Sequence, residues 1–517
     1  MKFKNYKYIL AAGLVSASLS SCDDFLDRPA EDSYTTDQYY QNDAECYNGV
    51  NYLYNIPWSD LLDSWFSELE NAAGNQYQGN NNFVLLSIPR TNENLGKMVR
   101  TQWAAIGNAN IVYNNIKGGN GSKAAKDATM GECLLWKGLG YFNLVRMLGP
   151  IPIVHDNSAD IGSNAYADKY CVETADAYEY TIMTLEKAME LLPKSAAEGR
   201  LDYYSAEALL AKVYLAKSGL NMNGSRNEAD LAMAAKLADD VIKNSGRELY
   251  TVYSDIFRGK NNFSKEALIS WHFYGTIQPW GAGNQLPAVF GMKGFTESLT
   301  WGDWTCPSVD LMEAFGVSPL DNPEVRPEVD VRRKATMMMV GDKYDYFWRD
   351  KGGFDYLRFA YDSDYNKQSD GAYHSGTGAN IVKHLVGNTN DHIAEVGYPE
   401  YSAQASGLSE HVLRLADVYL IYAEAVIGNN TSTTDESAID AFYAVRSRSV
   451  SNYKRPTSIS FDDVWKERRL ELAYEGDRWF DYVRMSYYNP ERALNELKNM
   501  KRSYFNGLDE LYKGYYE

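Results

Sequence analysis

The chain has 517 residues and a formal net charge of −18, and 14% of its residues are aromatic. So acidic a chain is a poor partner for the phosphate backbone of nucleic acids, and we exclude nucleic-acid binding. Length alone would suggest about three domains, but the patterns described below favour one helical scaffold that is interrupted by loops.

Residues 1–21 have the layout of a signal peptide, with three lysines among the first seven residues followed by a short apolar run and small residues. The apolar run is much shorter than the roughly 20 residues that a membrane-spanning helix needs. Leu19-Ser20-Ser21-Cys22 has the shape of a bacterial lipobox. We therefore expect Cys22 to carry the lipid anchor and residues 22–40 to form a solvated leash. The alternative is a free cysteine beside a signal.

Helical periodicity dominates five segments: 131–148, 175–192, 201–218, 228–244 and 410–427. Three of them carry pieces of the tetratricopeptide pattern: Trp136-x2-Leu139-Gly140, Leu210-Ala211-x2-Tyr214 and Leu415-Ala416-x2-Tyr419. Small residues at these positions let paired helices approach closely. The sequence thus predicts a mainly α fold, a tetratricopeptide-like superhelix with its scaffold in residues 41–254 and a further helical part in residues 406–517.

Residues 255–405 have a different character, rich in glycine, asparagine and aromatic residues with short β-like runs such as 267–275. We interpret them as a loop-rich, aromatic-rich insertion that faces the ligand, because binding residues collect on loops held by a rigid scaffold.

The stretch 465–485, WKERRLELAYEGDRWFDYVRM, reads as one amphipathic helix. Its predicted core face consists of Trp465, Leu472, Ala473, Gly476, Trp479, Phe480 and Val483. Opposite charges three residues apart, such as Arg468 and Glu471, predict a ladder of ion pairs on the exposed side. Glu471 and Glu475 are an alternative catalytic pair, but the pattern favours packing over chemistry.

The four remaining cysteines, Cys46, Cys133, Cys171 and Cys306, allow two disulfides but fit buried thiols better. They and the six histidines lack metal-ligand spacing. Residues 362–371 begin like a calcium loop but have no glycine at position six and no glutamate at position twelve, so a solvated loop is expected. We predict no metal and no cofactor.

These features together resemble one family. The lipobox followed by acidic residues, VLRLADVYLIYAEA at 412–425, AVRSRS at 444–449, ERRLELAYEGDRWFDYVR at 467–484 and GDWTCPSVDLMEAF at 302–315 are similar to the SusD/RagB family of surface lipoproteins. The resemblance implies an outward-facing, lipid-anchored protein of the outer membrane that captures oligosaccharides and delivers them to a SusC-like, TonB-dependent transporter. It implies no catalysis.

Sugar binding requires flat aromatic platforms together with amides and carboxylates for hydrogen bonds. We predict a glycan site from loop-like stretches that offer both: Trp301, Trp304, Trp280, Trp65 and Tyr77, with Asn75, Asn81 and Asp303 as polar partners. The alternative is that individual tryptophans of this set belong to the core. Two other functions stay open at this point, a surface glycoside hydrolase and an adhesion or peptide-handling lipoprotein.

Overall fold

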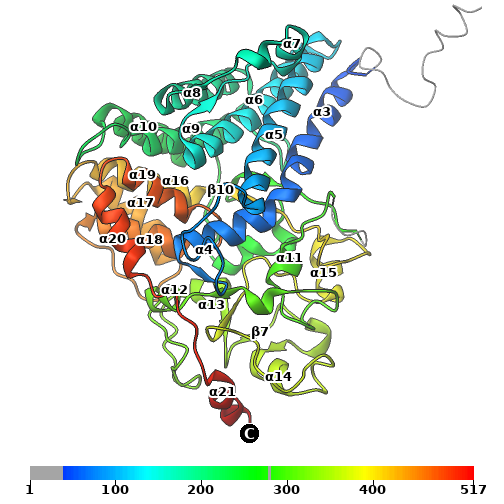
Figure 1. The fold of residues 1–517 in the computed structure, drawn as a ribbon, viewed down its shortest axis with the longest axis vertical. Coiled ribbons are helices and arrows are strands. Elements are labelled where there is room, and N and C mark those ends of the chain that lie inside the picture. The colour runs from blue at the N-terminus through cyan, green and yellow to red at the C-terminus, as the bar shows by residue number, and fades with distance from the viewer. Residues whose placement is uncertain (1–38, 277–280) are drawn as a thin grey trace, which may run out of the picture.

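The computed structural model describes residues 39–276 and 281–517, so Cys22, most of the predicted leash and Trp280 lie outside the described residues. The fold is mainly helical, as predicted (Figure 1). The α-helices are α3 (Asp43–Asn51), α4 (Leu69–Ala73), α5 (Glu93–Gly118), α6 (Lys123–Leu148), α7 (Asn157–Gly162), α8 (Thr174–Leu191), α9 (Tyr203–Lys217), α10 (Glu228–Asn244), α11 (Leu286–Phe290), α12 (Val309–Ala314), α13 (Arg332–Thr336), α14 (Tyr356–Tyr361), α15 (Thr389–Val396), α16 (Leu415–Ile427), α17 (Glu436–Ser447), α18 (Phe461–Glu471), α19 (Arg478–Ser486), α20 (Pro490–Asn499) and α21 (Leu508–Tyr516).

The long helices pack in chain order, α5 on α6, α6 on α8, α8 on α9 and α9 on α10. After the insertion, α16 packs against α10 and α17 packs against α16, so the array continues across a gap of some 170 residues in sequence (Figure 1). This is the predicted tetratricopeptide-like superhelix. Four of the five predicted helical segments are α6, α8, α9 and α10, whereas α5, the first long helix of the array, was not predicted.

Glycines on α6 explain how closely its neighbours approach. A Cβ added to Gly140 would lie 2.9 Å from Cγ1 of Ile106 on α5, and one added to Gly138 would lie 2.6 Å from Cδ2 of Leu185 on α8. Since both partners are buried, neither side chain has room to move away. The tetratricopeptide position Gly140 is therefore a helix contact, as its sequence pattern indicated.

Short strands pair two by two along the chain, all antiparallel, and β4 to β9 belong to the insertion. The pairs are β1 (Gln76–Tyr77) with β5 (Cys306–Pro307), β2 (Ile151–Pro152) with β3 (Cys171–Val172), β4 (Ala267–Trp271) with β10 (Glu410–Arg414), β6 (Met337–Met339) with β9 (Ala379–Ile381), β7 (Lys343–Tyr344) with β8 (Phe354–Asp355), and β11 (Ser432–Thr433) with β12 (Ile459–Ser460).

The predicted helix 410–427 is wrong in its first five residues, which form β10. This strand pairs with β4 from Glu410 opposite Trp271 to Arg414 opposite Ala267, with bulges between. The helix α16 begins only at Leu415. A partner about 140 residues away in sequence therefore overrides the local helical pattern.

The predicted single helix 465–485 is also wrong, because the chain forms α18 and α19 with a turn between them. Tyr474 has φ of 64° and Gly476 has φ of 73°, which is left-handed backbone that no α-helix can contain. Trp465 and Phe480 are buried as predicted, but Trp479 is only half-buried. Trp465 of α18 belongs to a small core cluster with Tyr482 and Met485 of α19, whereas Phe480 belongs to the main core.

All four described cysteines are free thiols, and Cys46, Cys133 and Cys306 are buried, whereas Cys171 is exposed. In the predicted solvated loop, Asp362 pairs with Arg358 at 2.8 Å and accepts the backbone N–H of Asp364. Across residues 39–276 and 281–517, no group of three or more histidine, cysteine or acidic side chains is placed to hold a metal ion. The helices in these two ranges are too short or too polar to cross a membrane.

Candidate functional site

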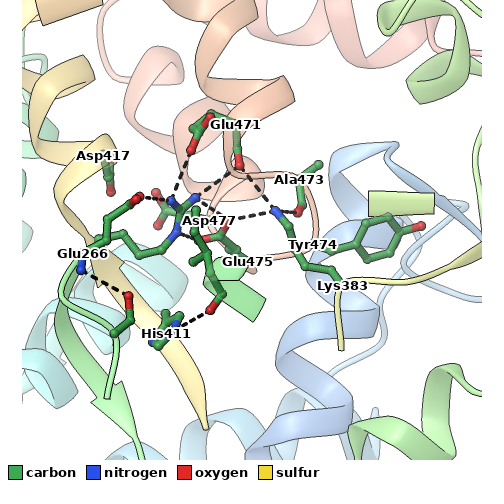
Figure 2. Close-up of polar contacts among 12 residues, drawn as sticks. Glu266, Lys383, His411, Asp417, Glu471, Ala473, Tyr474, Glu475 and Asp477 are labelled. Carbon is green, nitrogen blue, oxygen red and sulfur yellow. Dashed lines mark hydrogen bonds and ion pairs between the residues drawn. The ribbon is translucent and has the colours of Figure 1, made fainter. Parts of the chain in front are cut away.

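Glu471 and Glu475, the alternative catalytic pair, lie in a buried network of opposite charges that joins α18, α13 and β10 (Figure 2). Glu471 accepts hydrogen bonds from Arg332 at 3.1 Å and from Arg414 at 3.1 Å. Glu475 is bound by Arg414 at 2.7 Å and by Lys383 at 2.8 Å.

Burial opposes ionisation of Glu471, but the guanidinium groups of Arg448, Arg414 and Arg332 outweigh it and lower its pKa to about 2. The pKa of Glu475 is also lowered, because Arg414 and Lys383 outweigh its burial. Two carboxylates held ionised and fully paired have neither the raised pKa of a general acid nor access to a substrate. The motif therefore links strands and helices, and its ion pairs are buried, not on an exposed face as predicted.

Four chain segments meet around β5, close to the predicted site residues Trp304 and Tyr77. Trp304 ends the 3₁₀ turn η7 (Gly302–Trp304), just before β5, and Tyr77 on β1 pairs with Cys306 of β5. The N–H of Gly376 donates to the sulfur of Cys306 at 3.3 Å. The N–H of Phe505 in turn donates to the carbonyl of Gly376 at 3.0 Å.

These contacts hold the segments of three aromatic residues next to one another, and we call this set the aromatic face: Tyr77, Trp304 and Tyr504. Trp304 is 79% exposed and Tyr504 is 57% exposed, while Tyr77 is half-buried. The rings of Tyr77 and Tyr504 have centroids 6.4 Å apart. A Cβ on Gly376 would lie 3.1 Å from Cδ2 of Tyr504 and 3.5 Å from Cε1 of Tyr77, so the bare backbone there lies against both rings.

Polar groups flank the aromatic face on the side of η7. Asp303 accepts the backbone N–H of Lys293 at 3.3 Å, and burial raises the pKa of its carboxyl. His374 pairs with Asp370 at 2.8 Å. Asp303 and His374 line a hollow of only about 20 Å³. Because the hollow is about the size of one water molecule, it cannot enclose a sugar ring.

Two of the predicted site residues are core residues, and we withdraw them from the candidate site. Trp65 is 4% exposed and packs on Phe480 with ring centroids 5.4 Å apart. Asn75 is fully buried, donating to Glu70 at 2.7 Å and accepting from Arg469 at 2.8 Å. Both lie beside the C-terminal motif, which covers them.

Three further predicted residues differ in their setting. Trp301 is half-buried and packs against the main core, so only part of its ring is available. Asn81 donates to Glu68 at 3.1 Å and accepts from the N–H of Phe83 at 2.7 Å, so both ends of its amide are engaged within the protein. Trp280 lies outside the described residues.

The sequence prediction missed Tyr504 and His374. Tyr504 belongs to the segment between α20 and α21, and His374 belongs to a loop that begins some 60 residues after Trp304. The sequence around each of these two residues resembles that of an ordinary surface loop. Only the return of the chain to β5 brings their segments to this part of the molecule.

The sequence matches two family models in two separate parts of the chain. Residues 293–517 match the model described as "SusD family", and residues 24–215 match the model described as "Starch-binding associating with outer membrane". The chain belongs to the SusD family. The expected family membership is thereby confirmed.

Individual SusD-like relatives match most of the chain. A SusD-like protein of Bacteroides ovatus is 29% identical, over 97% of this chain and 86% of the relative. SusD-like protein P2 of Formosa agariphila is 26% identical, over 77% of this chain and 72% of the relative.

Solved structures of the family show the same fold. A crystal structure with a xylogluco-oligosaccharide is 29% identical and superposes with a TM-score of 0.76, covering 88% of this chain and 85% of the other. A SusD homolog from Bacteroides thetaiotaomicron, 20% identical, has a TM-score of 0.67 over 94% of this chain and 95% of the other.

Proposed function

We propose that this SusD-family protein binds oligosaccharides at the aromatic face. One observation carries the proposal: among the tryptophans of the described residues, Trp304 alone has an exposed ring. Exposing a large aromatic side chain to water forgoes the free energy of its burial, which favours a binding role. Flat rings stack on the apolar C–H faces of sugars, and Asp303 and His374 beside them bond hydroxyl groups.

The similarity to a structure solved with a xylogluco-oligosaccharide supports a glycan as the ligand. Because Trp304 and Tyr504 are exposed, the aromatic face suits an extended chain that lies across the rings better than a single enclosed sugar. In the cell, the protein captures such chains at the outer-membrane surface, tethered through Cys22, and passes them to a SusC-like, TonB-dependent transporter. It has no hydrolytic role.

A glycan array with the soluble chain from residue 23 onward tests the proposal, with xylogluco-oligosaccharides among the probes. We expect saturable binding to a defined group of glycans and no new reducing ends after prolonged incubation. Release of reducing ends would favour a glycoside hydrolase. Absence of binding to any glycan would favour an adhesion or peptide-handling lipoprotein.

A further inference from the structure

A groove of about 550 Å³ runs between α5 and α8 with α6 at its floor, away from the aromatic face. In Figure 1 these helices lie at the top of the molecule, whereas α11 and α12, on either side of η7, lie in its lower half. The groove is lined by Asn114 and Tyr113 of α5, Lys137 of α6, and Tyr180 and Met183 of α8.

Lys137 is the unusual residue of the groove, because its side chain is buried without an opposite charge. Three lysines are buried in the described part of the chain. Lys212 pairs with Asp417 at 2.7 Å and with Asp477 at 2.8 Å, and Lys383 pairs with Glu475 at 2.8 Å. Lys137 is 4% exposed and forms no ion pair with any described residue.

The protein gives the ammonium group of Lys137 only weak compensation. Nζ donates to the carbonyl of His155 at 2.8 Å and lies 5.5 Å from the centroid of the Tyr180 ring. An ammonium group has three donors, so this carbonyl leaves most of its hydrogen-bonding capacity open to the groove. Burial lowers the pKa of Lys137 to about 8.

The carboxylate that influences Lys137 most is Asp156, and it is already engaged. Asp156 accepts the N–H groups of Ser158 and Ala159 as the N-cap of α7, and it accepts the amide of Asn114 at 2.9 Å. Its attraction only partly offsets the lowering of the Lys137 pKa. A buried cation of this kind is stabilised when an anion enters the groove, because the anion restores the missing opposite charge.

The geometry points to a second ligand site in this groove, one that binds a carboxylate-bearing sugar, a uronic acid, with Lys137 donating to the carboxylate. The half-buried rings of Tyr113 and Tyr180 supply faces for a pyranose, and the groove volume is within the range of small-ligand sites. The groove is also lined by the exposed Lys117 and Lys187 and by Asp156, Glu186 and Glu190, and Lys137 is the buried cation among these charged residues. The site does not depend on the aromatic face.

The test is calorimetry on the full soluble chain with short oligosaccharides that end in glucuronate or galacturonate, each compared with its neutral glucose- or galactose-ended counterpart. We expect saturable binding of a uronate and at least tenfold weaker binding of its neutral counterpart. Lys137→Met, close in length and uncharged, should weaken uronate binding at least tenfold. Lys187→Met is the matched control, since Lys187 lines the same groove but is exposed and paired with Glu190, and it should change the affinity less than threefold.

A second measurement keeps the test decisive if Lys137→Met folds poorly. Acetylation of lysines in the parent protein, followed by mass spectrometry, should show that the uronate protects Lys137 and leaves Lys187 reactive. Equal binding of uronate and neutral sugar, or unchanged binding in Lys137→Met, overturns the inference. Loss of uronate binding in Trp304→Ala also overturns it, because the uronate then occupies the aromatic face. A tetra-aspartate peptide that protects Lys137 as well as the sugars do would assign the groove to a protein segment instead.

Discussion

Trp304→Ala is the sharpest test of the aromatic face. Since the ring is 79% exposed, its removal takes away little packing, and the melting temperature should stay within about a degree of the parent value. In the complex the same ring is covered by sugar. Covering it contributes roughly 1.5 to 3 kcal/mol, with a fully buried side chain as the upper guide. At about 1.4 kcal/mol per decade, the dissociation constant should rise tenfold to a hundredfold.

The assay is isothermal calorimetry with the glycan that binds best on the array. Tyr170→Ala is the matched control, because Tyr170 is 78% exposed but belongs to the segment before β3, outside the aromatic face. It should bind like the parent. Trp304→Phe, which retains a smaller ring, should fall between the parent and the alanine variant. If Trp304→Ala keeps the parent affinity while remaining folded, the exposed ring is not a sugar platform and the site lies elsewhere.

Four further predictions concern the lipid anchor, a buried carboxylate, a helix contact and the lysine of the groove. Cys22→Ala should release the protein from the membrane fraction with its fold intact; a variant that stays with membranes after a high-salt wash would contradict lipid anchoring. Glu471→Gln should lower the free energy of unfolding by about 3 to 5 kcal/mol, since it leaves buried arginines unpaired. In the parent protein, the stability that Glu471 contributes is present above pH 4.5 and is lost as the pH falls toward 2, so chemical denaturation of both proteins between these values should show their difference shrinking. Gly140→Ala should cost about 1 to 3 kcal/mol, because the new methyl group meets Ile106, and an unchanged melting temperature would refute that helix contact. Lys137→Met should be more stable than the parent at pH 7, by up to about 3 kcal/mol for a pKa lowered from 10.5 to about 8, and this advantage should shrink as the pH rises from 8 to 10.5.

The helical scaffold was largely predictable because its signal is local. Small residues at tetratricopeptide positions mark helix contacts, and Gly140 has that role in the structure. The errors arose where distant partners decide the conformation. Residues 410–414 become a strand because β4 is there to pair with them, and the motif 465–485 bends because Tyr474 takes up left-handed backbone. Neither cause can be read from a periodicity of 3.6 residues.

The candidate site was predictable only in part, for a similar reason. Trp304 follows no helical or alternating pattern, and it is exposed. Trp65 also stands in a polar, loop-like stretch, but its segment forms the π-helix Ser64–Glu68 and the ring packs on Phe480. Whether an aromatic residue in such a stretch is a platform or a core residue depends on what the rest of the chain places over it. For the same reason the sequence did not indicate Tyr504, which reaches the aromatic face from the C-terminal end of the chain.

Buried lysines and arginines in the described part of this protein are of two kinds: those that pair with opposite charges inside the fold, and Lys137, which does not. Around Glu471 the chain brings three arginines from α13, β10 and the end of α17 onto one carboxylate, and the whole set is closed within the fold. Every charge of this network has a partner without a ligand. The network therefore has a structural role and fixes how the insertion joins the scaffold. Lys137 is equally buried but lacks this closure, and it opens onto a groove. The chain is rich in carboxylates, and it pairs the buried Lys212 and Lys383 with them. An anion that binds from outside best explains why Lys137 has no such partner among the described residues.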